Sequence, residues 1–457
     1  MCAIHTLITY LAHAKKSRAH YDETWVALNW RLKLPTPETH LDFPLWSLGY
    51  TPEQVYDLFF PPDFRFLCNP ERPAVCGRFG LSQDRHWRFE FVVLEGEDGN
   101  VMASPGMIDK VVMPYFEHPG SRYGLQRSVA YPKDCIEILR SRPFNFSART
   151  CNKWAVGRVM LIGDAAHVFP PFGGQGLASG FRDASSLAWR LAVALKPDTD
   201  YNSLLQAWYA ERKQQLVRSL ALTIRNGQYV TERNWLKAQL RDWTLYAIQL
   251  SASGKRSIES GGRGARSVRY KYEHDMPFDP ASGGFVLPQV YCALISAKFA
   301  KSWRVQFTDD IIFQPRKRSL FQLVVLLQST DEYILSQHAL SKLSDLTHGA
   351  LVPEEATYIL QHTNYDPISI PDDGGPIYRL ATGEEFAKDS VLCAGRPEPM
   401  YYDPYRMAKE VDWKPFVIVR PDRFVFAACK DKEELLRAAK LVSRYVEPAS
   451  SGRMENL

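Results

Sequence analysis

The residues best suited to chemistry lie in one stretch, residues 157–183, with the sequence GRVMLIGDAAHVFPPFGGQGLASGFRD. Asp164 follows an apolar run here, and glycines follow at positions 173, 174 and 176. Glycines let the backbone approach a flat ligand closely, and the N-terminus of a following helix favours negative charge. Such a site could hold a polyol through Asp164 and stabilise an anionic ring through the amides of Leu177 and Ala178.

Plainer roles compete with this interpretation. Asp164 could instead close a turn after its strand, and His167 could be a general base or a packed, hydrogen-bonded histidine. The serine of residues 176–180 is displaced from the centre of a GxSxG pattern, and no His or Asp partners are indicated. We therefore exclude a hydrolase.

The elements that position this stretch follow from the spacing of its apolar residues. Residues 158–162 predict a strand buried on both faces. Helical spacing begins near Gly176 and ends before Pro197. A second helix, capped by Asn202 or Ser203, is expected to continue with a break towards residue 250.

Strand-like alternation occurs at residues 25–34, 86–94 and 136–148, which predicts an antiparallel sheet with one covered face. Residues 321–327 and 416–419 predict buried strands, and residues 431–446 an amphipathic helix, together a small C-terminal α/β domain. Residues 251–272, rich in Ser, Gly and Arg, predict a linker or exposed loop whose basic residues either bind an anion or are solvated.

Composition bounds the class of protein. The 457 residues carry a formal charge of +5 with the basic residues spread out, which argues against nucleic acid as a partner. Apolar runs are strand-sized, so no membrane span is expected. The eight cysteines form no CxxC pair, so no metal site is expected, and a reducing, cytoplasmic location fits them.

Three motifs, GDAAH, PPFGGQG and GFRDASSLAWRL, occur in order between residues 163 and 191. They resemble the ribityl- and isoalloxazine-binding segment of the single-component FAD-dependent aromatic hydroxylases, which include para-hydroxybenzoate hydroxylase and phenol hydroxylase. Residues 72–73 and 86–91 resemble the substrate sheet of these enzymes. Residues 284–289 and 416–422 resemble the thioredoxin-like C-terminal domain of the phenol hydroxylase branch.

The resemblance implies a monooxygenase that uses FAD, NAD(P)H and O2 to hydroxylate a phenolic or other electron-rich aromatic substrate, and it makes a homodimer a fair expectation. Asp164 would bind the ribityl chain, and Pro171 would place its carbonyl beside flavin and substrate. Asp183 and Arg182 would brace the start of the helix. The residues implied to contact the cofactor are Gly163, Asp164, Pro171, Gly174, Gln175, Gly176, Leu177 and Ala178, and those implied for the substrate are Trp87, Arg88 and Pro171.

The expected fold is α/β: an α+β substrate sheet, the remaining part of a Rossmann-type FAD-binding domain, and a thioredoxin-like domain. The expected divisions are a leader at 1–24, the substrate sheet at 25–150, the FAD-binding part at 151–250, a linker at 251–284 and the thioredoxin-like domain at 285–457. The family's GxGxxG turn for the ADP half of FAD is absent from this sequence. A second hypothesis therefore stays open, a truncated, inactive remnant that acts at most as a binding or dimerisation partner.

Overall fold

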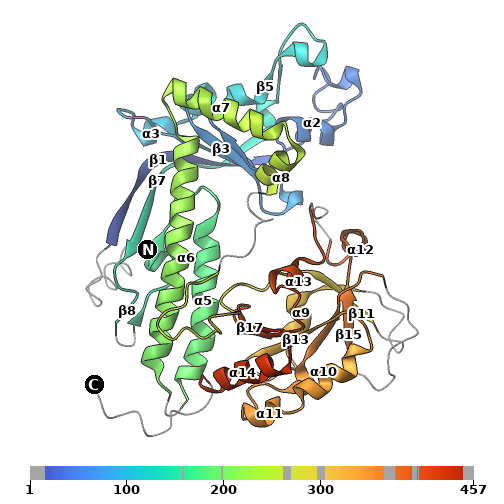
Figure 1. The fold of residues 1–457 in the computed structure, drawn as a ribbon. Helices are drawn as coiled ribbons and strands as arrows, with labels where there is room; N and C mark the ends of the chain where they lie inside the picture. The colour runs from blue at the N-terminus through green and yellow to red at the C-terminus, as the bar shows by residue number, and fades with distance from the viewer. Residues whose placement is uncertain are drawn as a thin grey trace. The chain divides into compact units, whose positions relative to one another are not determined.

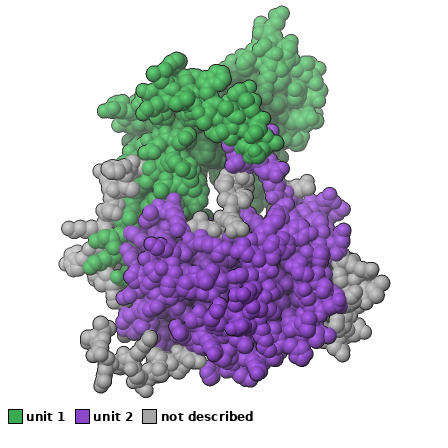
Figure 2. All heavy atoms as spheres, viewed as in Figure 1, with its two compact units in different colours: residues 1–178, 219–254 green, residues 179–218, 255–457 purple. Residues whose placement is uncertain are grey.

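The computed structural model describes residues 16–156, 159–196, 199–260, 269–295, 304–364, 376–393, 399 and 401–445. The chain divides into two compact units, coloured separately in Figure 2. Unit 1 contains residues 1–178 and 219–254, and unit 2 contains residues 179–218 and 255–457. Among the described residues, none of the helices combines the length and the hydrophobicity that a membrane span requires.

Unit 1 is built on a six-stranded antiparallel sheet in the order β10-β7-β1-β4-β3-β2. The strands are β1 (Lys16–Leu32), β2 (Arg65–Leu67), β3 (Ala74–Phe79), β4 (His86–Val92), β7 (Ile136–Cys151) and β10 (His167–Val168). The long strands β1 and β7 pair along most of their length, with Leu32 opposite Ile136 and Lys16 opposite Cys151. The expected antiparallel sheet is confirmed (Figure 1).

One face of this sheet is buried because apolar residues alternate along its strands. Val26, Leu28 and Trp30 of β1 join Trp87 and Phe89 of β4 in a single core. The helices α2 (Pro52–Phe59), α3 (Gly99–Met102) and α4 (Pro105–Val111) contribute side chains to the same core. The capping box of Thr51 and Gln54 fixes the start of α2.

The predicted boundary after a leader at residue 24 is wrong. Residues 16–24 are the first half of β1, and Asp22 and Thr24 pair with Ser147 and Asn145 of β7. The alternation of apolar and polar residues that predicts the strand begins only at Trp25. The residues before it are mostly polar, so they gave no signal of a strand. Two short hairpins complete the strands of unit 1, formed by β5 (Glu117–His118) with β6 (Val129–Ala130) and by β8 (Ala155–Val156) with β9 (Val159–Met160).

Four helices follow the glycine-rich stretch. They are α5 (Gln175–Ala194), α6 (Tyr201–Val230), α7 (Trp235–Gln249) and α8 (Ala252–Ser260). The predicted break before residue 250 is confirmed between α6 and α7. The predicted cap of α6 at Asn202 or Ser203 is wrong, because the side chain that accepts a hydrogen bond from the first turn is that of Asp200, which receives the N–H of Ser203. The predicted linker at 251–284 is only partly a linker, because α8 lies within it and Met276 and Phe278 pack in a buried cluster.

Unit 2 contains a seven-stranded mixed sheet in the order β12-β11-β15-β14-β13-β16-β17. Its strands are β11 (Tyr291–Ile295), β12 (Val305–Phe307), β13 (Gln322–Leu327), β14 (Thr357–Leu360), β15 (Ile377–Leu380), β16 (Phe416–Val419) and β17 (Val425–Cys429). β13, β14 and β15 run parallel, and β16 and β17 form an antiparallel hairpin beside β13. The predicted buried strands at 321–327 and 416–419 are confirmed.

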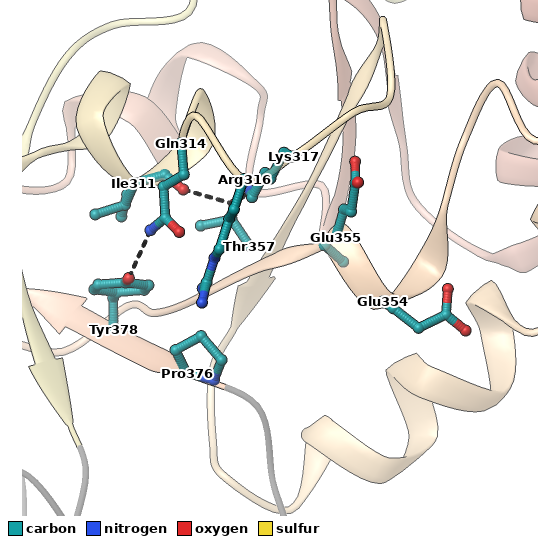
Figure 3. Close-up of a pocket in the computed structure, with 10 residues that line it drawn as sticks. Ile311, Gln314, Arg316, Lys317, Glu354, Glu355, Thr357, Pro376 and Tyr378 are labelled. Atoms are coloured by element: carbon teal, nitrogen blue, oxygen red, sulfur yellow. Dashed lines mark hydrogen bonds between the residues drawn. The ribbon is translucent and has the colours of Figure 1, made fainter.

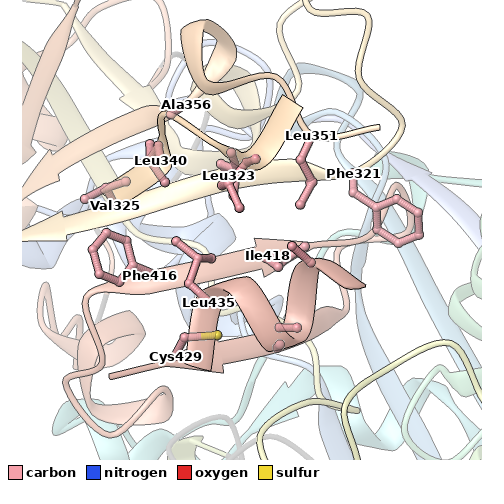
Figure 4. Close-up of a cluster of buried hydrophobic side chains, with 14 of the residues drawn as sticks. Phe321, Leu323, Val325, Leu340, Leu351, Ala356, Phe416, Ile418, Cys429 and Leu435 are labelled. Atoms are coloured by element: carbon pink, nitrogen blue, oxygen red, sulfur yellow. The ribbon is translucent and has the colours of Figure 1, made fainter. Parts of the chain in front are cut away.

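Both faces of the unit 2 sheet are covered. One face packs against α10 (Glu332–Leu340), α11 (Leu343–Leu346) and α14 (Lys432–Ser443), as Figure 4 shows for Leu323, Val325 and Leu435. The other face packs against α9 (Thr308–Ile312) and α13 (Arg406–Glu410). The helix α12 (Gly383–Lys388) starts with a capping box between Thr382 and Glu385. The C-terminal α/β arrangement is therefore as predicted.

Candidate functional site

The run before Asp164 is not the strand that its composition predicts. Within the described residues β9 pairs only with β8, as a two-residue hairpin. Leu161 is buried, but Val159 and Ile162 are 41% and 37% exposed. The prediction of a strand buried on both faces at 158–162 is therefore wrong, because no parallel strands of the described chain flank it.

Asp164 lies at a sharp turn directly after this run. Gly163 has φ +55°, a conformation that glycine adopts without steric cost, and residues Gly163–Ala165 form one turn of 3-10 helix. The side chain of Asp164 is exposed and makes no hydrogen bond or ion pair with the rest of the described chain. Its carboxylate is therefore free to accept hydrogen bonds from a hydroxyl-rich ligand.

His167 is a packed residue. It lies on β10 opposite Thr150, is 0% exposed, and its ring centroid lies 5.2 Å from that of Trp154. Of the two roles weighed for this histidine, the structure supports packing, because a fully enclosed ring offers no path to a substrate.

The proline- and glycine-rich loop is anchored by Phe172. This side chain is 1% exposed, and its ring packs against Trp25 of β1 and Phe66 of β2. The loop turns tightly after it, since the N–H of Gly174 donates to the carbonyl oxygen of Pro171 at 3.2 Å. Gly173 and Gly174 have φ of +107° and +61°, which a side chain would strain.

The helix α5 begins at the end of this loop, at Gln175. The side-chain amide of Gln175 donates to the carbonyl oxygen of Gly173 at 2.9 Å, which ties the first turn to the loop. Leu177 is 75% exposed. A Cβ added at Gly176 would meet only the Cβ of Phe169, at 4.0 Å. The first N–H groups of an α-helix have no partner within the helix, so the start of α5 favours a negatively charged group.

Asp183 has the structural role expected of it. Its buried carboxylate accepts a 2.7 Å hydrogen bond from Nε of Arg212 on α6. A second nitrogen of Arg212 donates to the hydroxyl and carbonyl oxygens of Ser179. This pair therefore fixes α5 against α6 within unit 2.

Phe172 of the loop packs on the second face of the unit 1 sheet, which carries polar side chains. Phe172 contacts Trp25, whose partner on β4 is Val92. The side chain of Glu90 projects from the same face of β4, two residues before Val92, which is about 7 Å along the strand. Arg88 follows on this face and donates from Nε to Oδ1 of Asn29 at 3.1 Å.

Glu90 is a candidate functional residue that the sequence did not reveal. It is 6% exposed, and one carboxylate oxygen lies 3.8 Å from Nε of Arg88. Burial raises the pKa of Glu90 above its ordinary value, although Arg88 and Arg140 oppose the shift. A carboxylate between Phe89 and Phe91 on a predicted strand is the signal that could have identified it.

Two of the three residues predicted to contact a substrate, Trp87 and Arg88, lie on opposite faces of β4. Trp87 is 1% exposed and packs in the main core of unit 1, with its ring 5.3 Å from that of Phe60. Arg88 lies on the face on which Phe172 packs, with its side chain 42% exposed. The structure therefore gives Trp87 a packing role and leaves Arg88 accessible to a ligand.

A separate polar pocket of about 300 Å³ lies in unit 2 and is shown in Figure 3. Gln314 donates to the hydroxyl of Tyr378 at 3.0 Å beside it, and Lys317 donates to the hydroxyl of Thr357. Burial lowers the pKa of Lys317 to about 8. None of the residues predicted to bind a cofactor or substrate lines this pocket.

Comparison with known proteins finds a family match that includes Asp164 and the glycine-rich loop. Residues 118–221 match the family described as FAD binding domain. Over 175 residues the chain is 33% identical to the 3-(3-hydroxy-phenyl)propionate/3-hydroxycinnamic acid hydroxylase of Burkholderia cenocepacia (strain HI2424), a match covering 38% of this chain and 29% of that protein. The enzyme of the same name from Comamonas testosteroni is 30% identical over 189 residues, 41% of this chain and 29% of its own length. The chain thus matches less than a third of each relative.

Solved structures share the fold over nearly the whole chain. The OxyS anhydrotetracycline hydroxylase from Streptomyces rimosus is 16% identical with a TM-score of 0.52, over 97% of this chain and 67% of that chain. The flavin-dependent monooxygenase PieE, solved with FAD and substrate, is 15% identical with a TM-score of 0.53, over 96% of this chain and 68% of that chain. The mixed α/β fold therefore resembles that of FAD-dependent hydroxylases.

Proposed function

We propose that this chain, of which residues 118–221 match the family described as FAD binding domain, is a monooxygenase that hydroxylates a phenolic or other electron-rich aromatic substrate with NAD(P)H and O2. The observation that carries this proposal is the exposed carboxylate of Asp164, placed directly before a glycine-rich loop and the N-terminus of α5. These groups suit the two chemical parts of a flavin, a polyol chain and a ring that becomes anionic on reduction.

The residues that fit the flavin are those predicted from the sequence: Gly163, Asp164, Pro171, Gly174, Gln175, Gly176, Leu177 and Ala178. When bound, the flavin supplies the electron-transfer and oxygen chemistry. Asp164 would accept hydrogen bonds from the ribityl hydroxyls. The first amides of α5 would stabilise negative charge at the pyrimidine edge of the ring, which favours its reduced form.

The substrate would lie on the sheet face that carries Glu90 and Arg88. A phenol reacts more readily with an electrophilic oxygen when its hydroxyl is ionised, so the site needs a group that accepts the phenolic proton. Glu90 can accept it on a carboxylate oxygen, because its raised pKa makes it a stronger base than an exposed glutamate. Arg88 would then hold the negative charge of the phenolate.

We further propose that residues 285–457 form a thioredoxin-like domain. Its support is the strand order β17-β16-β13-β14, in which β13 and β14 are parallel, β16 and β17 form an antiparallel hairpin, and α14 follows. The chain has no CxxC pair, so this domain would have no thiol redox role. Cytoplasmic location and a homodimer remain predictions.

The test is to incubate the purified 457-residue chain with FAD, desalt it and record its visible absorption. We expect bound flavin near one per chain, followed by phenol-dependent oxidation of NADH or NADPH and a hydroxylated product. A folded chain that retains no flavin and oxidises no nicotinamide would contradict the proposal and favour the inactive, partner-binding alternative.

A further inference from the structure

Three potential metal ligands meet at the end of β7 that lies away from the glycine-rich loop. They are His40, in the loop after β1, and Asp134 and Cys135, on the 3-10 turn that leads into β7. β10 pairs near the opposite end of β7, at Arg149 and Thr150. Along an extended strand that separation is about 50 Å, so this cluster is independent of the proposed flavin site.

The distances within the cluster fit one metal ion. Nε2 of His40 lies 3.1 Å and 3.2 Å from the two carboxylate oxygens of Asp134, and 3.7 Å from Sγ of Cys135. All three potential ligand atoms lie within 4.8 Å of one another. Ligands at about 2.0–2.3 Å around a tetrahedral ion are about 3.3–3.8 Å apart, so only small side-chain shifts are needed.

The hydrogen bonds around His40 orient its ring for metal binding. Nδ1 of His40 lies 2.8 Å from the hydroxyl of Thr39, and that hydroxyl donates to the carbonyl oxygen of Thr36. With a metal ion on Nε2, the neutral ring would carry its proton on Nδ1, where the hydroxyl of Thr39 is placed to accept it. Metal-binding histidines are oriented in this way by a partner on their second nitrogen.

The backbone holds the ligands in place without a metal. The carbonyl oxygen of His40 accepts the indole N–H of Trp46 at 2.8 Å. The carbonyl oxygen of Cys135 accepts the N–H of Lys33 at 2.9 Å. Lys133, the neighbouring cation, is paired with Asp109 at 3.1 Å and so does not occupy the cluster.

We propose that His40, Asp134 and Cys135 bind one zinc ion. A thiolate, a carboxylate and a neutral imidazole together balance the double charge of Zn²⁺, and a thiolate with an imidazole selects zinc over the harder Mg²⁺ and Ca²⁺. Cys135 is 4% exposed and the side chain of Asp134 is 76% exposed, so water can occupy the fourth position from the Asp134 side. The ion would join the loop after β1 to the start of β7.

The test uses the full chain, freed of metal with a chelator and titrated with Co²⁺ and then Zn²⁺. We expect one Co²⁺ per chain with a sulfur-to-cobalt charge-transfer band, loss of that band when Zn²⁺ is added, and a higher melting temperature with Zn²⁺. His40→Gln, a change at a mostly solvent-facing loop, and Cys135→Ser should each abolish the band and the rise in melting temperature.

The matched control is Cys76→Ser, which alters another buried cysteine of the same core. This variant should keep the band and the zinc-dependent rise. A parent chain that binds no Co²⁺, or whose band survives in both Cys135→Ser and His40→Gln, would overturn the proposal and leave the cluster as a His40–Asp134 ion pair beside a buried thiol.

Discussion

The carboxylate of Glu90 lies 3.8 Å from Nε of Arg88, on the sheet face opposite to the core that contains Trp87. β4 therefore places a buried carboxyl group and an accessible guanidinium cation on the same face, and Glu90 lies two positions along β4 from Val92, the partner of Trp25. This arrangement gives the proposed substrate face a group whose ionisation is sensitive to its surroundings.

Glu90→Gln should make stability less dependent on pH. Because burial raises the pKa of Glu90 from its ordinary value near 4.5, the folded state binds a proton more tightly than the unfolded state does. Stability is then lost as pH rises from the ordinary value through the raised one. The melting temperature of Glu90→Gln, relative to that of the parent, should rise across this range.

The exposed Glu95→Gln is the matched control for this comparison, and it should show no such trend. A difference between Glu90→Gln and parent that stays constant from pH 4 to pH 8 would contradict a raised pKa at Glu90.

Asp164→Ala should weaken flavin binding. The change removes hydrogen bonds between a charged group and the ribityl hydroxyls, worth about 1.5–3 kcal/mol, which corresponds to a loss of roughly tenfold or more in affinity. The measurement is quenching of flavin fluorescence on titration of FAD with protein. Asp63→Ala, at another exposed aspartate of unit 1, should bind like the parent; equal affinity in Asp164→Ala would remove Asp164 from the site.

Asp422→Asn should weaken unit 2 most near neutral pH. Burial opposes the ionisation of Asp422, but hydrogen bonds and charge from Arg420 and Arg190 hold its pKa at about 2, below the ordinary 3.8. This shift contributes about 2 kcal/mol of stability above pH 4, which is lost as pH falls towards 2. The difference in urea midpoint between parent and variant should therefore shrink between pH 6 and pH 2.

Removing either partner of the Asp183–Arg212 pair should destabilise the chain by about 3–5 kcal/mol, because the remaining charge is buried. Asp183→Ala with Arg212→Ala should cost much less than the sum of the two single changes. Urea unfolding of all four proteins measures this coupling. Additive effects would mean that the two residues act independently.

The sequence predicts most helices and strands in which apolar residues recur at a regular spacing. The strand at 86–94, the helix from Gly176 and the buried strand at 416–419 are present within a few residues, because each shows a clear apolar period. The exposed Asp164 and the helix start behind the glycine-rich loop follow from local chain chemistry, which a sequence displays directly.

What the sequence does not predict depends on pairing across long distances. The run at 158–162 looks like a buried strand, yet its burial depends on neighbours that the described chain does not provide. Glu90 lies in an alternating strand, and its burial arises only when the neighbouring strands β1 and β3 pair with β4. His40 lies far in sequence from Cys135, so no spacing rule relates them.

The pairing of β1 with β7 has a consequence for synthesis of the chain. Lys16–Leu32 leaves the ribosome roughly a hundred residues before the strand that completes its hydrogen bonds, at Ile136–Cys151. At about 5–20 residues per second, that interval lasts roughly 5–20 seconds. During it a strand whose second half is rich in apolar residues has an unpaired edge, so nascent chains stalled before residue 136 should bind chaperones that recognise extended segments.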